Sequence, residues 1–226
     1  MTDVSVRQRV LADNEAAAAQ VRARFHAQGT LVVNLISSPG AGKTTLLEAT
    51  IARLAHRLRM GAIEGDIATE RDAARLRRLG VPAHQVLTGG ACHLDARQIQ
   101  QALQASPMSG LDVLFIENVG NLICPTAYDL GEDFKVVVLS VTEGDDKPFK
   151  YPGIFSRAEV AVISKMDLLP HVNFGFEEVR TQIETLRPGV RILPLSAVRG
   201  DGMGEWGELL ETRLQAKRAA AAAPAR

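Results

Sequence analysis

The chain of 226 residues is long enough for one α/β domain with a sizeable core, and we expect a single domain. Its 26 lysines and arginines balance its 26 aspartates and glutamates, which argues against nucleic acid or an anionic membrane as a partner. No apolar run approaches the roughly 20 residues that span a bilayer, and charged residues interrupt the N-terminus, so we expect a cytoplasmic protein.

The two ends of the chain differ in composition from its centre. Residues 3–28 are rich in alanine, arginine and glutamine and precede Gly29, a pattern typical of a helix that ends at a glycine. We therefore assign residues 1–29 to an N-terminal helical extension and residues 30–218 to the main domain. Residues 219–226 are mostly alanine, have little to bury and are expected to form a disordered tail.

The main domain alternates between strand and helix patterns. An apolar run at 31–36 is followed by a glycine-containing turn and by a helical pattern over 43–59. This alternation predicts an α/β fold with a mostly parallel sheet and helices on both of its faces. The further apolar runs are 60–63, 111–116, 134–141, 160–163 and 190–195.

The turn after the first strand matches a phosphate-binding P-loop. The segment Ser37-Ser38-Pro39-Gly40-Ala41-Gly42-Lys43-Thr44 departs from the motif only at its first glycine, which is serine here. Gly40 and Gly42 let the backbone amides face anionic phosphates, and Lys43 reaches the outer phosphates. A plain strand-to-helix turn would instead leave a lysine at a helix start, where the helix dipole disfavours it. The residues predicted to contact the nucleotide are Ser38, Pro39, Gly40, Ala41, Gly42, Lys43, Thr44 and Thr45.

Two later segments predict that the base is guanine. Ser164-Lys165-Met166-Asp167 follows an apolar run and resembles the N-K-x-D signature of GTPases, with serine in place of asparagine. Asp167 would accept hydrogen bonds from the guanine ring nitrogen and amine, while the stem of Lys165 lies along the base. Ser196 and Ala197 resemble the short loop that closes over guanine. The alternative is an ordinary solvated helix start.

Acidic residues at predicted strand ends are candidates for magnesium binding and catalysis. Asp66 and Glu117 should both face the phosphates, and Glu117 begins a D-x-x-G-like switch motif that ends at Gly120, a predicted nucleotide contact. Magnesium prefers oxygen ligands, so we expect it to bind Thr44 and one or both carboxylates. Asp66 could instead position the attacking water, and Lys43, Asp66 and Glu117 are the candidate catalytic residues. Helix caps or surface acids are the alternative for both carboxylates.

The acidic loop at 143–147 follows another predicted strand end. Because ligand sites lie beyond the carboxyl ends of parallel strands, this loop should lie at the same sheet edge as the nucleotide. Its Lys147 would contact a phosphate or a base across a dimer interface, and a solvated turn is the alternative.

Two cysteines and a histidine predict a transition-metal site. Cys92 and His93 are adjacent, and Cys124 follows Glu117 by seven residues, so both loops belong near the nucleotide face of the sheet. Two thiolates and an imidazole suit nickel or zinc and leave one position open for exchange. The alternative is two small buried thiols beside a surface histidine.

Four separated strings resemble the hydrogenase nickel-incorporation GTPases, the HypB family. They occur in the family's order at residues 64–69 (EGDIAT), 92–96 (CHLDA), 116–125 (IENVGNLICP) and 140–152 (SVTEGDDKPFKYP). The resemblance runs from about Leu31 to the helix after Trp206. It implies a P-loop NTPase fold of the SIMIBI type, the branch that holds the signal-recognition and MinD-like proteins.

The resemblance also implies an activity and its partners. The activity is hydrolysis of GTP with Mg²⁺, coupled to delivery of Ni²⁺ or Zn²⁺ bound by Cys92, His93 and Cys124. The implied partners are a second copy in a GTP-dependent homodimer, the hydrogenase large-subunit precursor and a partner nickel chaperone. Some family members carry an N-terminal cysteine cluster or histidine-rich stretch, whereas this chain has only His26 before the P-loop. Metal handling is therefore expected to rest on the GTPase domain.

Three other functions remain open from the sequence. The urease nickel GTPases typically carry a C-P-H triplet, whereas cysteine and histidine are adjacent here. A non-hydrolysing nucleotide-dependent scaffold would not need the acidic residues Asp66 and Glu117. A small-molecule kinase would keep the P-loop but would not need a guanine-reading lysine and aspartate.

Overall fold

A seven-stranded sheet forms the centre of the computed structural model, which describes residues 3–67 and 70–222. Its strands lie in the order β3-β2-β4-β1-β5-β6-β7, and every neighbouring pair is parallel, as the alternation of patterns predicts. The strands are β1 (Leu31–Ser37), β2 (Met60–Asp66), β3 (Ala83–Leu87), β4 (Val113–Glu117), β5 (Phe134–Ser140), β6 (Val160–Ser164) and β7 (Arg191–Pro194).

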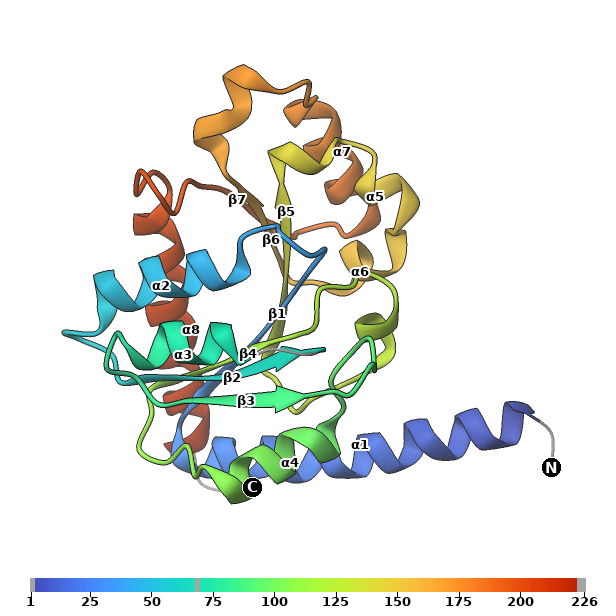
Figure 1. Ribbon diagram of the computed structural model, residues 1–226, viewed down its shortest axis with the longest axis vertical. Helices are drawn as coiled ribbons and strands as arrows, with labels where there is room; N and C mark the ends of the chain where they lie inside the picture. The colour runs from blue at the N-terminus through green and yellow to red at the C-terminus, as the bar shows by residue number, and fades with distance from the viewer. Residues whose placement is uncertain (1–2, 68–69, 223–226) are drawn as a thin grey trace.

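Helices cover both faces of this sheet (Figure 1). They are α1 (Asp3–Gln28), α2 (Lys43–Leu54), α3 (Arg71–Arg77), α4 (Ala96–Ala105), α5 (Lys147–Lys150), α6 (Pro152–Arg157), α7 (Phe176–Leu186) and α8 (Met203–Ala222), with short 3-10 helices η1 (Cys124–Ala127), η2 (Val141–Glu143) and η3 (Met166–His171). The core that α2, α3 and α8 form on one face includes Leu47, Phe115 and Trp206. On the other face α1 and α4 pack beside β1, β2 and β4, and α6 and α7 pack beside β5 and β6. None of the helices in the described ranges combines the length and apolar character needed to cross a membrane.

One strand and one helix boundary differ from the sequence prediction. The edge strand β3 was not expected, because its buried Gln85 interrupts any apolar run. The amide of Gln85 instead donates to the carbonyl of Glu64 at 2.8 Å and accepts from the backbone of Ala73 at 3.2 Å. The helix predicted over 43–59 ends at Leu54, and a turn follows before β2 begins.

The alanine-rich end of the chain is partly helical. α8 continues through Ala222, so the prediction of a disordered tail is wrong for residues 219–222, while residues 223–226 lie outside the described residues. Alanine has the highest helix propensity, and extending a helix that is already packed needs no new nucleus.

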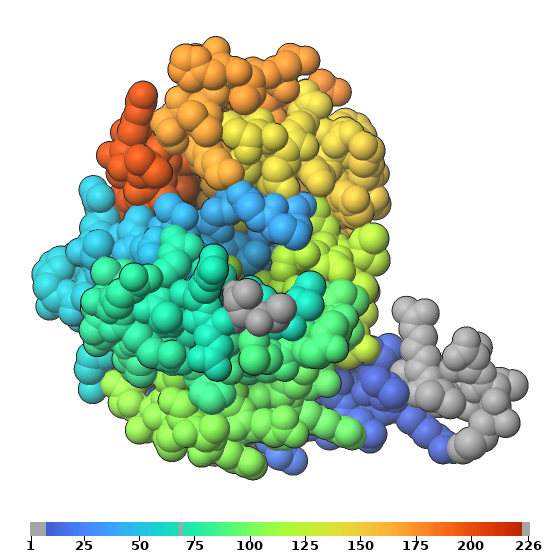
Figure 2. Space-filling model, viewed as in Figure 1, coloured from blue at the N-terminus to red at the C-terminus, as the bar shows by residue number. Residues whose placement is uncertain are grey.

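The N-terminal helix α1 spans the range that the sequence predicts and packs into the core of the domain. Its Ala18, Val21 and Phe25 are buried, and the last two belong to the core between the sheet and α4. α1 lies alongside α4 at the lower edge of Figure 1, and its N-terminal end projects beyond the rest of the domain. Figure 2 shows α1 in blue at the lower right, against the green surface of α4.

Asp112 joins three segments of the chain and gives a test of the packing. Its carboxylate accepts hydrogen bonds from the backbone and guanidinium of Arg59 at 2.7 and 3.0 Å and from Arg218 of α8. Although burial opposes ionisation, these hydrogen bonds lower the pKa of Asp112 to about 2. We expect Asp112→Asn to lower the free energy of unfolding by about 1–3 kcal/mol at neutral pH, because a charged acceptor of several donors is lost.

The effect of this substitution should depend on pH with a defined sign. The folded-state pKa of Asp112 lies below the unfolded value of about 3.9, so the stability is fully present above that value. It is lost as the pH falls through the folded-state pKa of about 2. Urea unfolding of the wild type and of Asp112→Asn should therefore converge in acid, and a difference that persists there would contradict the assignment.

Candidate functional site

A pocket with a volume of about 490 Å³ lies at the carboxyl ends of the central strands. β1 pairs with β4 on one side and β5 on the other, so this edge is the switch point where open α/β sheets bind ligands. The predicted site residues that line it are Pro39, Gly40, Gly42, Lys43, Thr44, Thr45, Asp66, Glu117, Gly120 and Lys165. The phosphate loop, the end of β2, the switch motif and the lysine that is predicted to read the base thus meet in one cavity.

The backbone of the phosphate loop depends on glycine. Gly40 and Gly42 have φ angles of 78° and 99°, in the left-handed region that favours glycine. Gly42 immediately precedes α2 and has no side chain to cap it, so the first amides of this helix are available to an anion. A Cβ on Gly120 would lie 2.8 Å from Pro39, so only glycine lets the switch motif approach the phosphate loop this closely.

Lys43, Thr44 and Glu117 form a buried polar cluster at the base of the pocket. The Lys43 ammonium donates to the Ser37 hydroxyl at 2.9 Å and lies 3.9 Å from a carboxylate oxygen of Glu117. The Thr44 hydroxyl donates to the same oxygen at 3.0 Å. The serine that replaces the first P-loop glycine therefore holds the lysine in place.

Glu64 is a site residue that the sequence analysis missed. It pairs with Glu117 in the register of β2 and β4 and is 1% exposed. Burial raises the pKa of Glu64 well above its ordinary value, and the adjacent Glu117 raises it further. Burial also raises the pKa of Glu117, against the effect of Lys43. The available signal is the two-residue period of a strand, which places Glu64 on the same side as Asp66.

The carboxylates of this cluster fit a magnesium ion. Glu64 Oε1 and Glu117 Oε2 are buried and, among the described residues, have no donor other than a proton that the two carboxyls would share. Buried oxygens in need of a partner, beside the hydroxyl of Thr44, are the donor set that a hard divalent cation prefers. Asp66 lines the same pocket.

Arg75 is a second residue that no sequence motif indicated. Its guanidinium lines the pocket and is held by Glu48 at 2.6 Å and by Asp72 at 3.2 Å. The hydrogen bonds that Arg75 donates to Glu48 raise the pKa of Arg75, so a positively charged guanidinium lines the pocket.

The segment that is predicted to read the base is hydrogen-bonded to the phosphate loop. The Ser164 hydroxyl donates to the carbonyl of Ala41 at 2.6 Å, so the serine in the asparagine position keeps a hydrogen bond to the loop. Lys165 crosses the loop with its ammonium 2.8 Å from the carbonyl of Gly40, and its φ of 58° is left-handed. Ser196 donates to Asp167 at 2.5 Å. Five predicted nucleotide contacts, Ser38, Ala41, Asp167, Ser196 and Ala197, lie outside the lining of the pocket.

Lys147 also lies outside the pocket. Its ammonium is 5.4 Å from the centroid of the Tyr151 ring, and the preceding Asp146 forms an ion pair with Lys150. Asp145 accepts a hydrogen bond from the backbone of Gly175 at 3.0 Å. Within one chain the acidic loop is thus tied to its own neighbours.

The two cysteines and the histidine converge as a metal site requires. The ligand atoms of Cys92, His93 and Cys124 all lie within 4.8 Å of one another, and Cys92 Sγ is 3.6 Å from His93 Nδ1. The Cys124 thiol raises the pKa of Cys92, as expected for two thiols that share a proton. Burial lowers the pKa of His93, which keeps the imidazole neutral and available as a ligand. The ring of Tyr128 packs on His93 at 4.0 Å between centroids.

The nucleotide pocket and the metal loop share a buried asparagine. Asn118 lines the pocket, is 1% exposed and accepts a hydrogen bond from the backbone of Leu94 at 3.0 Å. The side chain of Leu94 in turn packs on Gly65, where an added Cβ would lie 2.8 Å from it. The switch motif is therefore hydrogen-bonded to the loop that carries Cys92 and His93.

The chain is similar to known proteins over most of its length. Residues 31–194 match the model of the CobW/HypB/UreG nucleotide-binding domain. The hydrogenase maturation factor HypB of Azotobacter chroococcum mcd 1 is 48% identical over 97% of this chain and 75% of its own length. The crystal structure of HypB from Helicobacter pylori in complex with nickel is 39% identical, with a TM-score of 0.85, over 95% of this chain and 99% of that one.

A more distant structure agrees in fold alone. The signal recognition particle 54 kDa protein of Aeropyrum pernix K1 in complex with GDP is 16% identical, with a TM-score of 0.55, over 82% of this chain and 49% of that one. Together with the parallel sheet, these similarities confirm the predicted P-loop NTPase fold of the SIMIBI type.

Proposed function

Because the chain belongs to the HypB branch of the CobW/HypB/UreG family, we propose that it is a GTP-hydrolysing metallochaperone that assists nickel insertion into the hydrogenase large subunit. The observation that carries this proposal is the link between two sites: Asn118 joins the phosphate pocket to the loop of the Cys92, His93 and Cys124 cluster. A nucleotidase without a cargo would not need two thiols and an imidazole gathered beside its switch motif.

The residues of the pocket divide the work of phosphate transfer. The amides of the phosphate loop and Lys43 bind and orient the phosphates, and Thr44, Glu117 and Asp66 would hold the magnesium ion. Magnesium, when bound, supplies charge that offsets the developing negative charge on the phosphates. Asp66 could instead position the attacking water. Arg75 adds a fixed positive charge at the same pocket.

The cargo site suits an ion that is picked up and released. Cys92, His93 and Cys124 are all partly exposed, and three protein ligands leave a position for a further donor on nickel or zinc. We infer that a second copy of the chain supplies it in a GTP-dependent homodimer. Two exposed apolar side chains lie nearby: Ile67, 52% exposed, follows β2, and Ile123, 66% exposed, precedes Cys124. Such a partner would cover both of them. The proposed further partners are the hydrogenase large-subunit precursor and a nickel chaperone.

The test of this function is a pair of measurements on the full chain. Phosphate release from GTP with magnesium should exceed the uncatalysed rate, and nickel should bind in a manner that requires the two cysteines. Nickel binding without phosphate release would favour a scaffold, and phosphate release from ATP as readily as from GTP would contradict the guanine assignment.

Asp167→Asn should change the base specificity. The amide exchanges an acceptor for a donor at the base edge, so GTP affinity should fall by roughly 100-fold or more, with a shift toward xanthine nucleotides. The variant keeps an oxygen for the Ser196 hydroxyl, so the fold should be retained. Competition titrations with GTP, XTP and ATP measure the change, and unaltered GTP affinity would remove Asp167 from the site.

Lys147→Ala should weaken the GTP-dependent dimer. The ammonium lies 5.4 Å from the centre of the Tyr151 ring in one chain and is expected to contact the nucleotide of the other. Analytical ultracentrifugation with a GTP analogue measures the dimer, and Lys150→Ala, on the same short helix, serves as the control. Equal dimerisation of wild type and Lys147→Ala would show that the contact is unimportant.

A further inference from the structure

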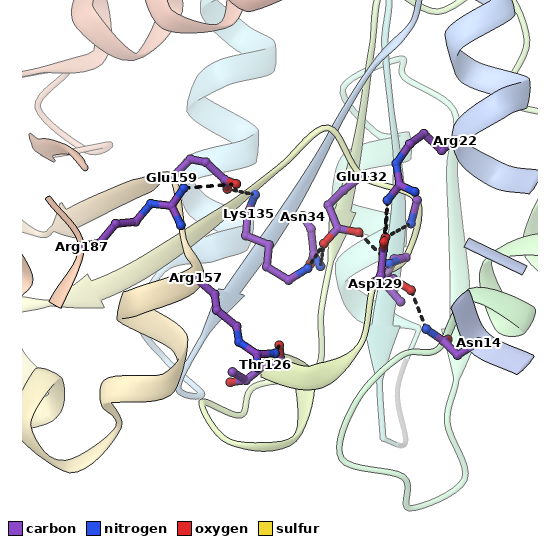
Figure 3. Close-up of polar contacts among 12 residues, drawn as sticks. Asn14, Arg22, Asn34, Thr126, Asp129, Glu132, Lys135, Arg157, Glu159 and Arg187 are labelled. Atoms are coloured by element: carbon purple, nitrogen blue, oxygen red, sulfur yellow. Dashed lines mark hydrogen bonds and ion pairs between the residues drawn. The ribbon is translucent and has the colours of Figure 1, made fainter. Parts of the chain in front are cut away.

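α1 carries a buried asparagine whose two hydrogen-bonding groups face different segments of the domain. Asn14 is 5% exposed, its amide donates to the carbonyl of Asp129 at 2.8 Å, and its oxygen accepts from the backbone of Ala96 at 2.8 Å. Figure 3 shows the bond to Asp129. Asparagine is a poorer helix former than alanine, and a buried amide is costly unless it is paired, so these two bonds account for its presence in α1.

The two segments that Asn14 joins are the ones that carry the metal ligands. Ala96 begins α4 and lies three residues after His93, whereas Asp129 lies five residues after Cys124. The same two segments meet again where Tyr128 packs on His93. One side chain of the N-terminal helix therefore links the two segments that carry the metal ligands.

Further contacts hold α1 against the Cys124 segment. Arg22 donates to both carboxylate oxygens of Asp129 at 2.6 Å, as Figure 3 shows. Gly131, at φ 84°, lies so close to α1 that an added Cβ would be 2.7 Å from Val21. Asp13, next to Asn14, forms an ion pair at 2.7 Å with Arg97 of α4, on the side of the Cys92 segment.

We propose that Asn14 is a positioning residue of the metal site, which fixes the separation of the Cys92-His93 segment from the Cys124 segment. This inference rests on the metal site of the proposed function and assigns a role to the N-terminal helix. Without the bridge, an ion would have to order two loops that α1 now holds together, and affinity falls when a site is less preorganised. Thermodynamic linkage makes the effect mutual. If packing of α1 on the domain raises nickel affinity, nickel must stabilise the packed position of α1 by the same factor.

The test compares nickel binding in three full-length proteins. Asn14→Ala should lower nickel affinity by roughly tenfold or more, as loss of a supporting partner does at other metal sites, with a weaker thiolate-to-nickel absorption band at equal nickel. Its affinity for a GTP analogue should stay within about twofold of the wild type, since none of the described residues that line the nucleotide pocket belongs to α1. Phe25→Leu is the matched control, because it loosens the packing of the buried end of α1 without touching either hydrogen bond. It should lower the melting temperature and leave nickel affinity unchanged.

Amide hydrogen exchange gives the reciprocal readout. Nickel should slow exchange in α1 of the wild type and lose this effect in Asn14→Ala. Equal nickel affinity in the wild type and Asn14→Ala, or equal losses in Asn14→Ala and Phe25→Leu, would overturn the inference alone. Nickel binding by the wild type that survives removal of both cysteines would overturn the proposed metal site and this inference with it.

Discussion

Lys43→Ala is expected to abolish GTP turnover while the domain remains folded. The ammonium lies in the pocket, 2.9 Å from Ser37, where it would meet the outer phosphates of the nucleotide. Loss of one fixed donor to a developing phosphate charge typically costs roughly 100- to 1,000-fold in rate, and nucleotide affinity should fall as well. Phosphate release and calorimetric titration with a GTP analogue measure the two effects.

The fold should survive because the cluster has a way to neutralise itself. Lys43 is only 7% exposed, and its charge opposes the rise in the pKa of Glu117 that burial causes. When the ammonium is removed, the Glu64 and Glu117 carboxyls can hold a proton instead of facing each other as two charges. Lys150→Ala, at an exposed lysine, is the control. A variant that hydrolyses GTP at the wild-type rate would contradict the assignment, and loss of cooperative melting would make Lys43 a structural residue.

The central strands follow from the sequence because burial on both faces makes them continuous apolar runs. β1 and β5 are examples, with every residue of β1 buried. β3 could not be found in this way, since its buried Gln85 depends on hydrogen bonds to Glu64 and Ala73 that only the folded chain provides. The helical end of α8 was missed for a different reason. Its alanines bury little, but they suffice to extend a helix that is already packed.

The site residues also divide into those that a local sequence pattern predicts and those that only long-range contacts place. Residues in a contiguous motif, such as Lys43 and Glu117, could be predicted because the spacing of the motif implies a known local structure. Arg75 belongs to no such motif, and ion pairs hold it in the lining of the pocket, whereas strand register places Glu64 beside Glu117. Asn14 is the extreme case, since its two partners are 82 and 115 residues away along the chain. Contacts of that kind leave no periodic signal.

Nickel should bind more tightly to the GTP-analogue form than to the GDP form. The switch motif that begins at Glu117 leads into Cys124, and Asn118 of the same motif holds the backbone of Leu94, two residues after Cys92. A phosphate that reorders the motif therefore acts on both ligand loops. A cysteine from the second subunit would fill the open position on the ion, so metal should favour the dimer that GTP assembles. Coupling of this kind is typically about 5- to 150-fold, and nickel must change GTP affinity by the same factor.

Titration of nickel into the GDP-bound and GTP-analogue-bound protein measures the coupling. Variants at two asparagines distinguish a loss of coupling from a general loss of nickel affinity. Among the described residues, Asn121 accepts hydrogen bonds from its own loop alone, from Ile123 at 2.7 Å and Cys124 at 3.4 Å. Asn121→Ala should therefore weaken nickel binding in both nucleotide states and leave their ratio unchanged. Asn118→Ala, which cuts the bond to the other ligand loop, should bring the ratio close to one. Equal nickel affinity in both states of the wild type, or nickel binding that persists in Cys92→Ala and Cys124→Ala, would rule out the mechanism and leave the two cysteines as structural thiols.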